Sequence, residues 1–131
     1  GESVYIVNVE LKATQSGYKA DMSFTDKEGR IHEKHIENRE RYTMQGNYLA
    51  ALIAVLETLQ NPCMLSIYSH SDYIAEPIRQ GWLNSWAVHE WRNAKGKTVR
   101  NAEQWQQVKK LLANHSVRFI TREEKEETQD V

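Results

Sequence analysis

The stretch that decides the fold lies between Ser69 and Trp105, and reads SHSDYI (69–74), GWLNSWAVHEW (81–91), KGKTVRN (95–101) and EQW (103–105). It contains all four tryptophans of the chain. Helical spacing predicts a short helix over 71–78, a second over 80–91 and a third over 101–114. A polar, basic loop is expected over 93–100. Trp86 and Trp91 are expected to pack between these helices, since large aromatic side chains dominate cores.

Upstream of this stretch, the segment LAALIAVLETL (49–59) continues an apolar helical pattern that begins at Met44. Thr43 is a suitable N-cap, and Asn61-Pro62 ends the helix. Strands are predicted over 4–11, 18–25, 30–38, 64–69 and 117–121. The first three form an antiparallel meander, and the long helix forms a right-handed crossover to the fourth. The fold class is therefore α/β, with a mixed five-stranded sheet of three antiparallel strands plus a parallel pair, flanked by helices.

Size and composition predict one domain over residues 1–121, followed by a charged, flexible tail over 122–131. A net charge of −1 indicates no general affinity for nucleic acid or membranes. The chain has one cysteine, Cys63, and no apolar run of membrane-spanning length. A cytoplasmic protein with no membrane contact is expected.

The quoted stretch resembles type 1 ribonuclease H. In that family a strand ends in Thr-Asp-Ser followed by one residue and Tyr, and a Trp-rich helix pair with a basic connection comes next. Val-x-Asn then leads into a helix that carries a Trp. The similar landmarks in this chain are Tyr73, Trp82, Trp86, Trp91, Val99, Asn101 and Trp105. Residues 49–59 also look like the family's first helix, so the resemblance runs from about residue 4 to residue 121 and implies a ribonuclease H-like fold.

This resemblance also implies where catalysis is expected. The family hydrolyses the RNA strand of RNA–DNA hybrids with two divalent ions, which carboxylates hold. Matched by position, the expected carboxylates are replaced by Asn8, Tyr48 and His70, and no residue matches the fourth. The sequence therefore predicts a catalytically inactive domain with a degenerate active site and no cofactor. An alternative is an active enzyme with atypical ligands and Mg²⁺ or Mn²⁺, for instance a single ion held by His70, Asp72 and Glu10.

Nucleic-acid binding remains open, because basic residues gather in one part of the chain. Residues 79–110 hold seven Lys or Arg against Glu90 and Glu103. The resemblance places this region at a protrusion that grips the hybrid backbone, and phosphate contacts of this kind do not depend on sequence. The candidate binding residues are Thr43, Trp82, Lys95, Lys97, Arg100, Asn101 and Trp105, with Trp82 and Trp105 expected to be exposed. A solvated loop with no ligand is the alternative.

Three functions remain open at this point. The first is an inactive domain that binds an RNA–DNA hybrid, another nucleic acid or a protein partner. The second is an active nuclease with an altered metal set. The third is a structural role in which the edge strand at 30–38 pairs with another chain, although its alternating charges oppose such pairing.

Overall fold

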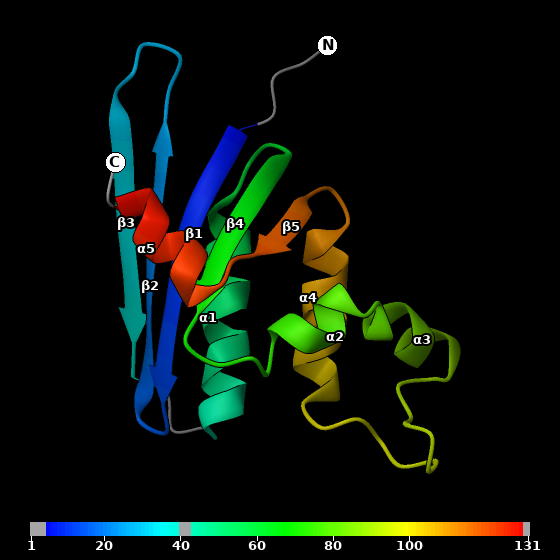
Figure 1. Cartoon of the computed structure of the whole chain (residues 1–131). Helices are drawn as coiled ribbons and strands as arrows, with labels where there is room; N and C mark the ends of the chain where they lie inside the picture. The colour runs from blue at the N-terminus through cyan, green and yellow to red at the C-terminus, as the bar shows by residue number, and fades with distance from the viewer. Residues whose placement is uncertain (1–4, 40–42, 130–131) are drawn as a thin grey trace.

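The computed structural model describes residues 5–39 and 43–129, and it confirms the predicted fold class. Five strands form one sheet in the order β3-β2-β1-β4-β5, with helices on both faces (Figure 1). In chain order the elements are β1 (Tyr5–Thr14), β2 (Gly17–Thr25), β3 (Ile31–Asn38), α1 (Met44–Thr58), β4 (Cys63–Ser69), α2 (Ala75–Arg79), α3 (Trp82–Val88), α4 (Ala102–Leu112), β5 (Ser116–Phe119) and α5 (Arg122–Gln129).

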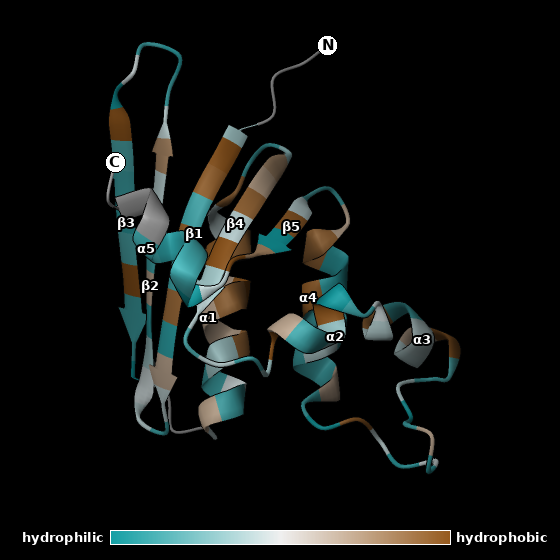
Figure 2. Ribbon diagram, in the orientation of Figure 1, coloured by the Kyte–Doolittle hydropathy of each residue, from teal (hydrophilic) through white to brown (hydrophobic). Residues whose placement is uncertain are grey.

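The sheet pairs as the sequence predicts. β1 is antiparallel to β2, and β2 is antiparallel to β3, whereas β4 runs parallel to both β1 and β5. Successive side chains of a strand point to opposite faces. The inner face therefore carries the buried Val7, Val9 and Leu11 of β1, and the outer face carries Asn8 and Glu10. Figure 2 shows this contrast as alternating brown and teal bands along the strands.

The predicted N-cap and core helix are confirmed. The Thr43 hydroxyl accepts a hydrogen bond from the Gly46 backbone N–H at 3.0 Å and satisfies one of the donors left free at the helix start. α1 is buried along most of its length and packs on the inner face against β1 and β2, and α4 packs against α1. The helix ends at Thr58 with Leu59 as its C-cap, just before the Asn61-Pro62 breaker.

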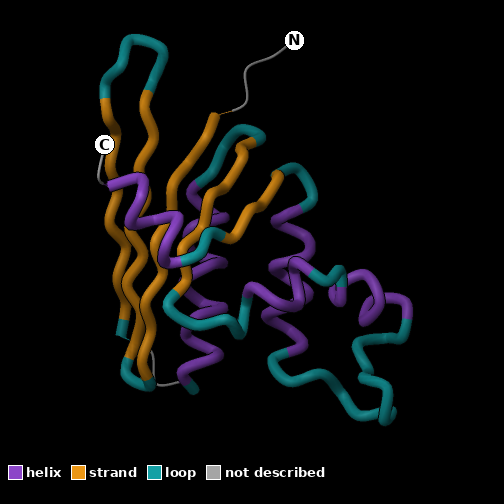
Figure 3. The backbone as a smooth tube through the Cα atoms, in the orientation of Figure 1, coloured by secondary structure: helices purple, strands orange, loops and turns teal. Residues whose placement is uncertain are grey.

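α2, α3 and the loop that leads to α4 form a lobe beside the sheet, which is plain in the tube view (Figure 3). An aromatic cluster joins this lobe to α4 and consists of Tyr73, Trp82, Trp86, Trp91 and Trp105. Adjacent rings have centroids 5.8–6.3 Å apart. Asn101 begins α4 in the left-handed conformation, which asparagine tolerates better than most residues.

The segment after β5 differs from the expectation. Residues expected to form a flexible tail instead form α5, which lies across the outer face of the sheet (Figure 1). The division into a domain over 1–121 and a separate tail stays a prediction. Over the residues that the structure describes, no helix is both long enough and apolar enough to cross a bilayer. A cytoplasmic location likewise stays a prediction.

Candidate functional site

The three positions matched to the family's carboxylates come from three different parts of the chain. Asn8 lies on the outer face of β1, and His70 directly follows β4. Tyr48 instead lies on α1 beneath the inner face and is 4% exposed. Burial raises the pKa of Tyr48 above its usual value, while a hydrogen bond from the Ala13 backbone opposes this shift. Tyr48 is thus a core residue, and its hydroxyl contacts the backbone of β1 at Ala13.

Glu10 supplies a carboxylate beside His70. One of its oxygens lies 2.8 Å from the His70 Nε2 atom, and the His70 backbone N–H donates to the Leu11 carbonyl at 3.1 Å. The strand register explains this contact. Glu10 of β1 lies opposite Tyr68 of β4, and His70 follows β4 directly, so its side chain lies close to Glu10. We call these two side chains the Glu10–His70 pair. Sequence reasoning named Glu10 only in the alternative single-ion set.

Two further groups surround the Glu10–His70 pair. The Lys125 ammonium of α5 hydrogen-bonds the second oxygen of Glu10, and it lies 4.6 Å from the centre of the Tyr68 ring. Tyr68 also meets the His70 ring edge-on at 4.8 Å. Burial alone raises the pKa of Glu10, but the hydrogen bonds from Lys125 and His70 outweigh this and hold that pKa below its usual value. Glu10 is therefore a carboxylate anion at neutral pH.

Glu10 lines an open groove of about 1080 Å³ on the outer face of the sheet. Further along the groove, His35 hydrogen-bonds Asp21 at 2.6 Å and Glu37 at 3.1 Å. These bonds, first the one to Asp21 and then the one to Glu37, raise the pKa of His35 above its usual value. The floor and walls include Asn8, Glu10, Asp21, His35, Arg118 and Lys125. The groove therefore holds both signs of charge.

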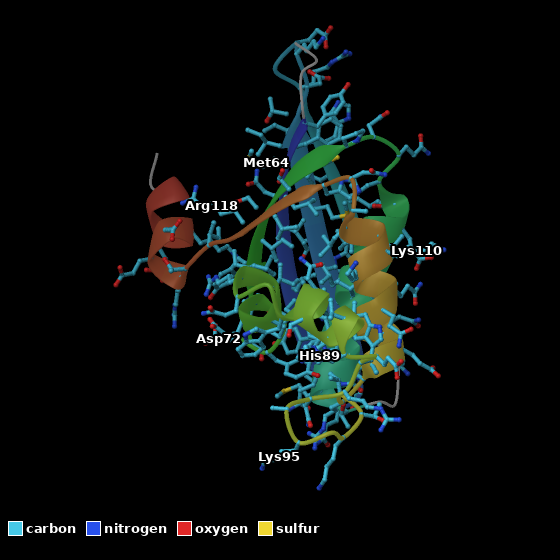
Figure 4. The ribbon with its side chains drawn as sticks, turned by 90° about the vertical axis from the view of Figure 1, so that its right-hand side faces the viewer. Met64, Asp72, His89, Lys95, Lys110 and Arg118 are labelled. Carbon is cyan, nitrogen blue, oxygen red and sulfur yellow. The ribbon has the colours of Figure 1, made fainter. Side chains whose placement is uncertain are left out.

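A pair of divalent ions, as the resemblance implies, does not fit the arrangement observed. Within the described part of the chain, no three His, Cys, Asp or Glu side chains are grouped closely enough to hold an ion. Asp72 of the alternative set is exposed, and its carbonyl caps the start of α2 (Figure 4 labels this residue). Glu10 already faces an ammonium group. With α5 in this position, the residues present thus do not match the acidic cluster that two Mg²⁺ ions require.

The basic loop, residues 93–100, is exposed over most of its length and projects from the lobe. The Asn93 side-chain oxygen accepts hydrogen bonds from the backbone of Lys95 at 2.9 Å and of Lys97 at 3.1 Å. Gly96 adopts a positive φ of 77° at the turn. Figure 4 shows Lys95 pointing outward from the tip of this loop. Arg100 is exposed as well, so the loop presents three cations to solvent.

The other predicted binding residues differ in exposure. Trp82 is 45% exposed, as expected for a contact residue. Trp105 is 1% exposed, so the expectation that it lies at the surface is wrong: its ring packs against the Trp86 ring of α3. Its assignment as a binding residue stays a prediction. The Asn101 side chain is half-buried and donates to the Tyr73 hydroxyl at 3.0 Å. Thr43 has its hydroxyl engaged in the cap of α1.

Sequence comparison agrees with this architecture. A family model described as RNase H matches residues 9–121. Ribonuclease H of Bradyrhizobium diazoefficiens is 36% identical over 79% of this chain and 64% of its own length. Ribonuclease H of Clostridium botulinum is 37% identical over 68% of this chain and 60% of its own length. The chain thus spans less than two thirds of the length of these curated relatives.

Two solved structures share the fold. A type 1 RNase H with the type 2 active-site motif superposes with a TM-score of 0.76 at 16% identity, over 91% of this chain and 63% of its own. An RNase H1 in complex with an RNA/DNA hybrid superposes with a TM-score of 0.58 at 18% identity, over 92% and 87% of the two chains. Identities this low bear on the fold alone.

The curated relatives overturn two expectations from the sequence. The prediction of a catalytically inactive pseudoenzyme is wrong, because proteins 36–42% identical to this chain carry the name Ribonuclease H. The prediction that no cofactor is involved is wrong for the same reason, since ribonuclease H enzymes depend on Mg²⁺. The match of Asn8, Tyr48 and His70 to the family's carboxylates stays a prediction from the resemblance, and it did not justify the conclusion of inactivity.

Proposed function

Because the chain belongs to the ribonuclease H family, we propose that it hydrolyses the RNA strand of RNA–DNA hybrids, with a divalent cation and a ligand set that differs from the family's acidic cluster. The observation that carries this proposal is the Glu10–His70 pair, whose side chains meet at 2.8 Å beside the end of β4. The carboxylate of Glu10 thus lies next to His70, the residue that the resemblance matches to one of the family's acidic side chains.

The Glu10–His70 pair can hold and move a proton. When the His70 Nε2 atom donates to Glu10, the Nδ1 atom is the proton acceptor of the ring, and Glu10 fixes both the tautomer and the orientation. An imidazole held in this way acts as a general base toward water, and proton transfer of this kind contributes about 10²–10⁴-fold to a rate.

The basic loop is the proposed contact with the nucleic-acid backbone, and exposed Trp82 lies on the same lobe. Lys95, Lys97 and Arg100 present positive charge on a segment whose backbone is fixed by Asn93. Phosphate contacts position a duplex without reading its sequence. This arrangement supports binding of the hybrid through its backbone.

Cleavage of a labelled hybrid is the direct test of this function. The full chain is expected to cut the RNA strand of an RNA–DNA hybrid with Mg²⁺ or Mn²⁺ present, and to stop when a chelator is added. The products are separated on a denaturing gel. The same RNA as a single strand and as an RNA duplex serves as the control for substrate class. Uncut hybrid with either ion present, while a known ribonuclease H cuts it, would contradict the proposal.

Binding through the basic loop makes a second, separate prediction. Substituting Lys95→Ala and Lys97→Ala together is expected to weaken hybrid binding and to lower the slope of log affinity against log salt by about 0.9 for each phosphate that the variant no longer neutralises. Fluorescence anisotropy between about 50 and 200 mM salt measures this, a range over which such contacts change affinity strongly. The control is Lys27→Ala, an exposed lysine in the hairpin between β2 and β3. Equal slopes for the loop variant and the unmodified chain would rule out this contact.

A further inference from the structure

Two successive residues just after α3, Glu90 and Trp91, adopt the left-handed backbone conformation, with φ of 57° and 62°. We call these two residues the left-handed turn. The conformation is unfavourable for any residue with a side chain, and a bulky residue such as tryptophan rarely adopts it. Residues in such conformations persist only where the surrounding contacts hold them. The left-handed turn leads through Arg92 into the basic loop, and it therefore sets the direction in which that loop leaves the lobe.

The contacts around the left-handed turn form a complete C-terminal cap of α3. The Trp91 backbone N–H donates to the Trp86 carbonyl at 2.6 Å, and the Glu90 N–H donates to the Ala87 carbonyl at 3.3 Å. This is the Schellman arrangement, in which glycine is usual at the position that Glu90 occupies. The motif commonly adds an apolar contact between its two ends, and here the Trp91 and Trp86 rings lie 6.3 Å apart. Trp91 thus holds a turn that glycine would form without strain.

Trp91 also closes the basic loop. Its carbonyl accepts a hydrogen bond from the Val99 N–H at 2.9 Å, and Val99 is buried. Between these two residues, Arg92 and Thr98 form an antiparallel bridge. The two ends of the loop are therefore fixed against each other and against the lobe, although the lysines between them are exposed to solvent.

We propose that Trp91 is a positioning residue for nucleic-acid binding: it holds the left-handed turn and thereby keeps the cations of the basic loop in a fixed arrangement before a duplex binds. This inference rests on the proposed function, because it concerns binding of the same hybrid. Ordering a flexible segment during binding costs free energy, so a loop that is already ordered binds more tightly. The strain of the left-handed turn is overcome when the chain folds, and it therefore does not weaken binding.

Hybrid binding without divalent ions tests this inference, because no cleavage step is involved. Trp91→Ala is expected to weaken binding by about tenfold, since a few long side chains must then be ordered on binding. The slope of log affinity against log salt is expected to stay unchanged, because every cation remains. Trp91→Phe keeps an aromatic ring against Trp86 and is expected to bind within about threefold of the unmodified chain. Fluorescence anisotropy with a chelator present measures both the affinity and the slope.

Trypsin digestion of the free protein shows whether the basic loop has lost its order. Trypsin cuts after lysine and arginine, and residues 92–100 contain four of them. Trp91→Ala is expected to be cut within 92–100 about tenfold faster than the unmodified chain, because cleavage follows the population of the open loop. The rest of the chain is expected to be cut no faster. Mass spectrometry locates each cut.

A pair of variants at Glu90 tests the strain of the left-handed turn. Glu90→Gly is expected to raise the melting temperature by about 3 °C relative to Glu90→Gln, because glycine adopts the left-handed conformation freely. Both variants remove the same charge, so the difference between them reports on the backbone alone. Equal melting temperatures would show that the turn holds no strain and would overturn the inference.

The inference is also overturned if Trp91→Ala binds the hybrid within about twofold of the unmodified chain, or if its salt slope falls. Faster trypsin cuts throughout the chain would overturn it too, since Trp91 would then support the whole fold and not the loop. These outcomes are separate from cleavage. A chain that binds as described yet never cuts a hybrid would refute the proposed function and leave the inference standing. A chain that cuts the hybrid, while Trp91→Ala binds it unchanged, would do the reverse.

Discussion

Replacing Trp105 with alanine is expected to lower the free energy of unfolding by about 3–5 kcal/mol, the range for large aromatic side chains removed from a core. Trp105 is 1% exposed and lies 5.8 Å from the Trp86 ring and 5.9 Å from the Tyr73 ring. Its indole N–H also donates to the Tyr73 hydroxyl at 3.4 Å. The substitution leaves a cavity between α4 and the lobe, because rigid helices on both sides cannot close around alanine. Urea denaturation followed by circular dichroism measures the decrease.

Trp82→Ala is the matched control for this prediction. The Trp82 ring is 45% exposed and stands at the edge of the same aromatic cluster, so its removal is expected to cost less than about 1 kcal/mol. Equal decreases for the two variants would mean that Trp105 does not fill a buried site. Tryptophan fluorescence of both variants reports whether the remaining rings keep their packing.

The prediction of the fold from residues 69–105 succeeds for a physical reason. The aromatic residues that identify the stretch are the ones that pack the lobe against α4, so the residues of the motif also hold this part of the fold together. Tyr73 illustrates this, since its hydroxyl meets both Asn101 and Trp105. The exposure of Trp82 and Trp105 was harder to predict, because helical spacing within one helix does not show which side chain a neighbouring helix covers. Trp105 was therefore wrongly expected at the surface.

The candidate site was harder to predict, since it depends on contacts between distant segments. Matching position by position led to Asn8, although Glu10 lies two residues later on the same face of β1. The period of two along a strand is the signal that points to Glu10. Lys125 lies 115 residues from Glu10 in sequence, and no local pattern links them. The helix that carries Lys125 lacks apolar spacing, but Thr121 followed by Glu124 is a capping-box pattern that indicates its start.

Replacing Glu10 with glutamine is expected to lower kcat/KM for hybrid cleavage by about 10²-fold or more, the range for loss of a group that supports proton transfer. The amide has nearly the same size, but it carries no charge to hold His70 or to attract a cation. Binding of the hybrid is expected to stay within about threefold or to tighten, because a negative charge is removed from a surface that faces phosphates. Steady-state cleavage and anisotropy on the same preparation separate the two effects.

The control for this variant is Glu33→Gln, which removes a carboxylate from the wall of the same groove without touching the Glu10–His70 pair. It makes the same change in net charge, and its cleavage rate is expected to stay within about threefold of the unmodified chain. If both variants lose activity alike, the groove acts through its overall charge and Glu10 has no special part. If Glu10→Gln alone loses activity while its unfolding midpoint is unchanged, the carboxylate beside His70 performs the role of the family carboxylate that the resemblance had matched to Asn8.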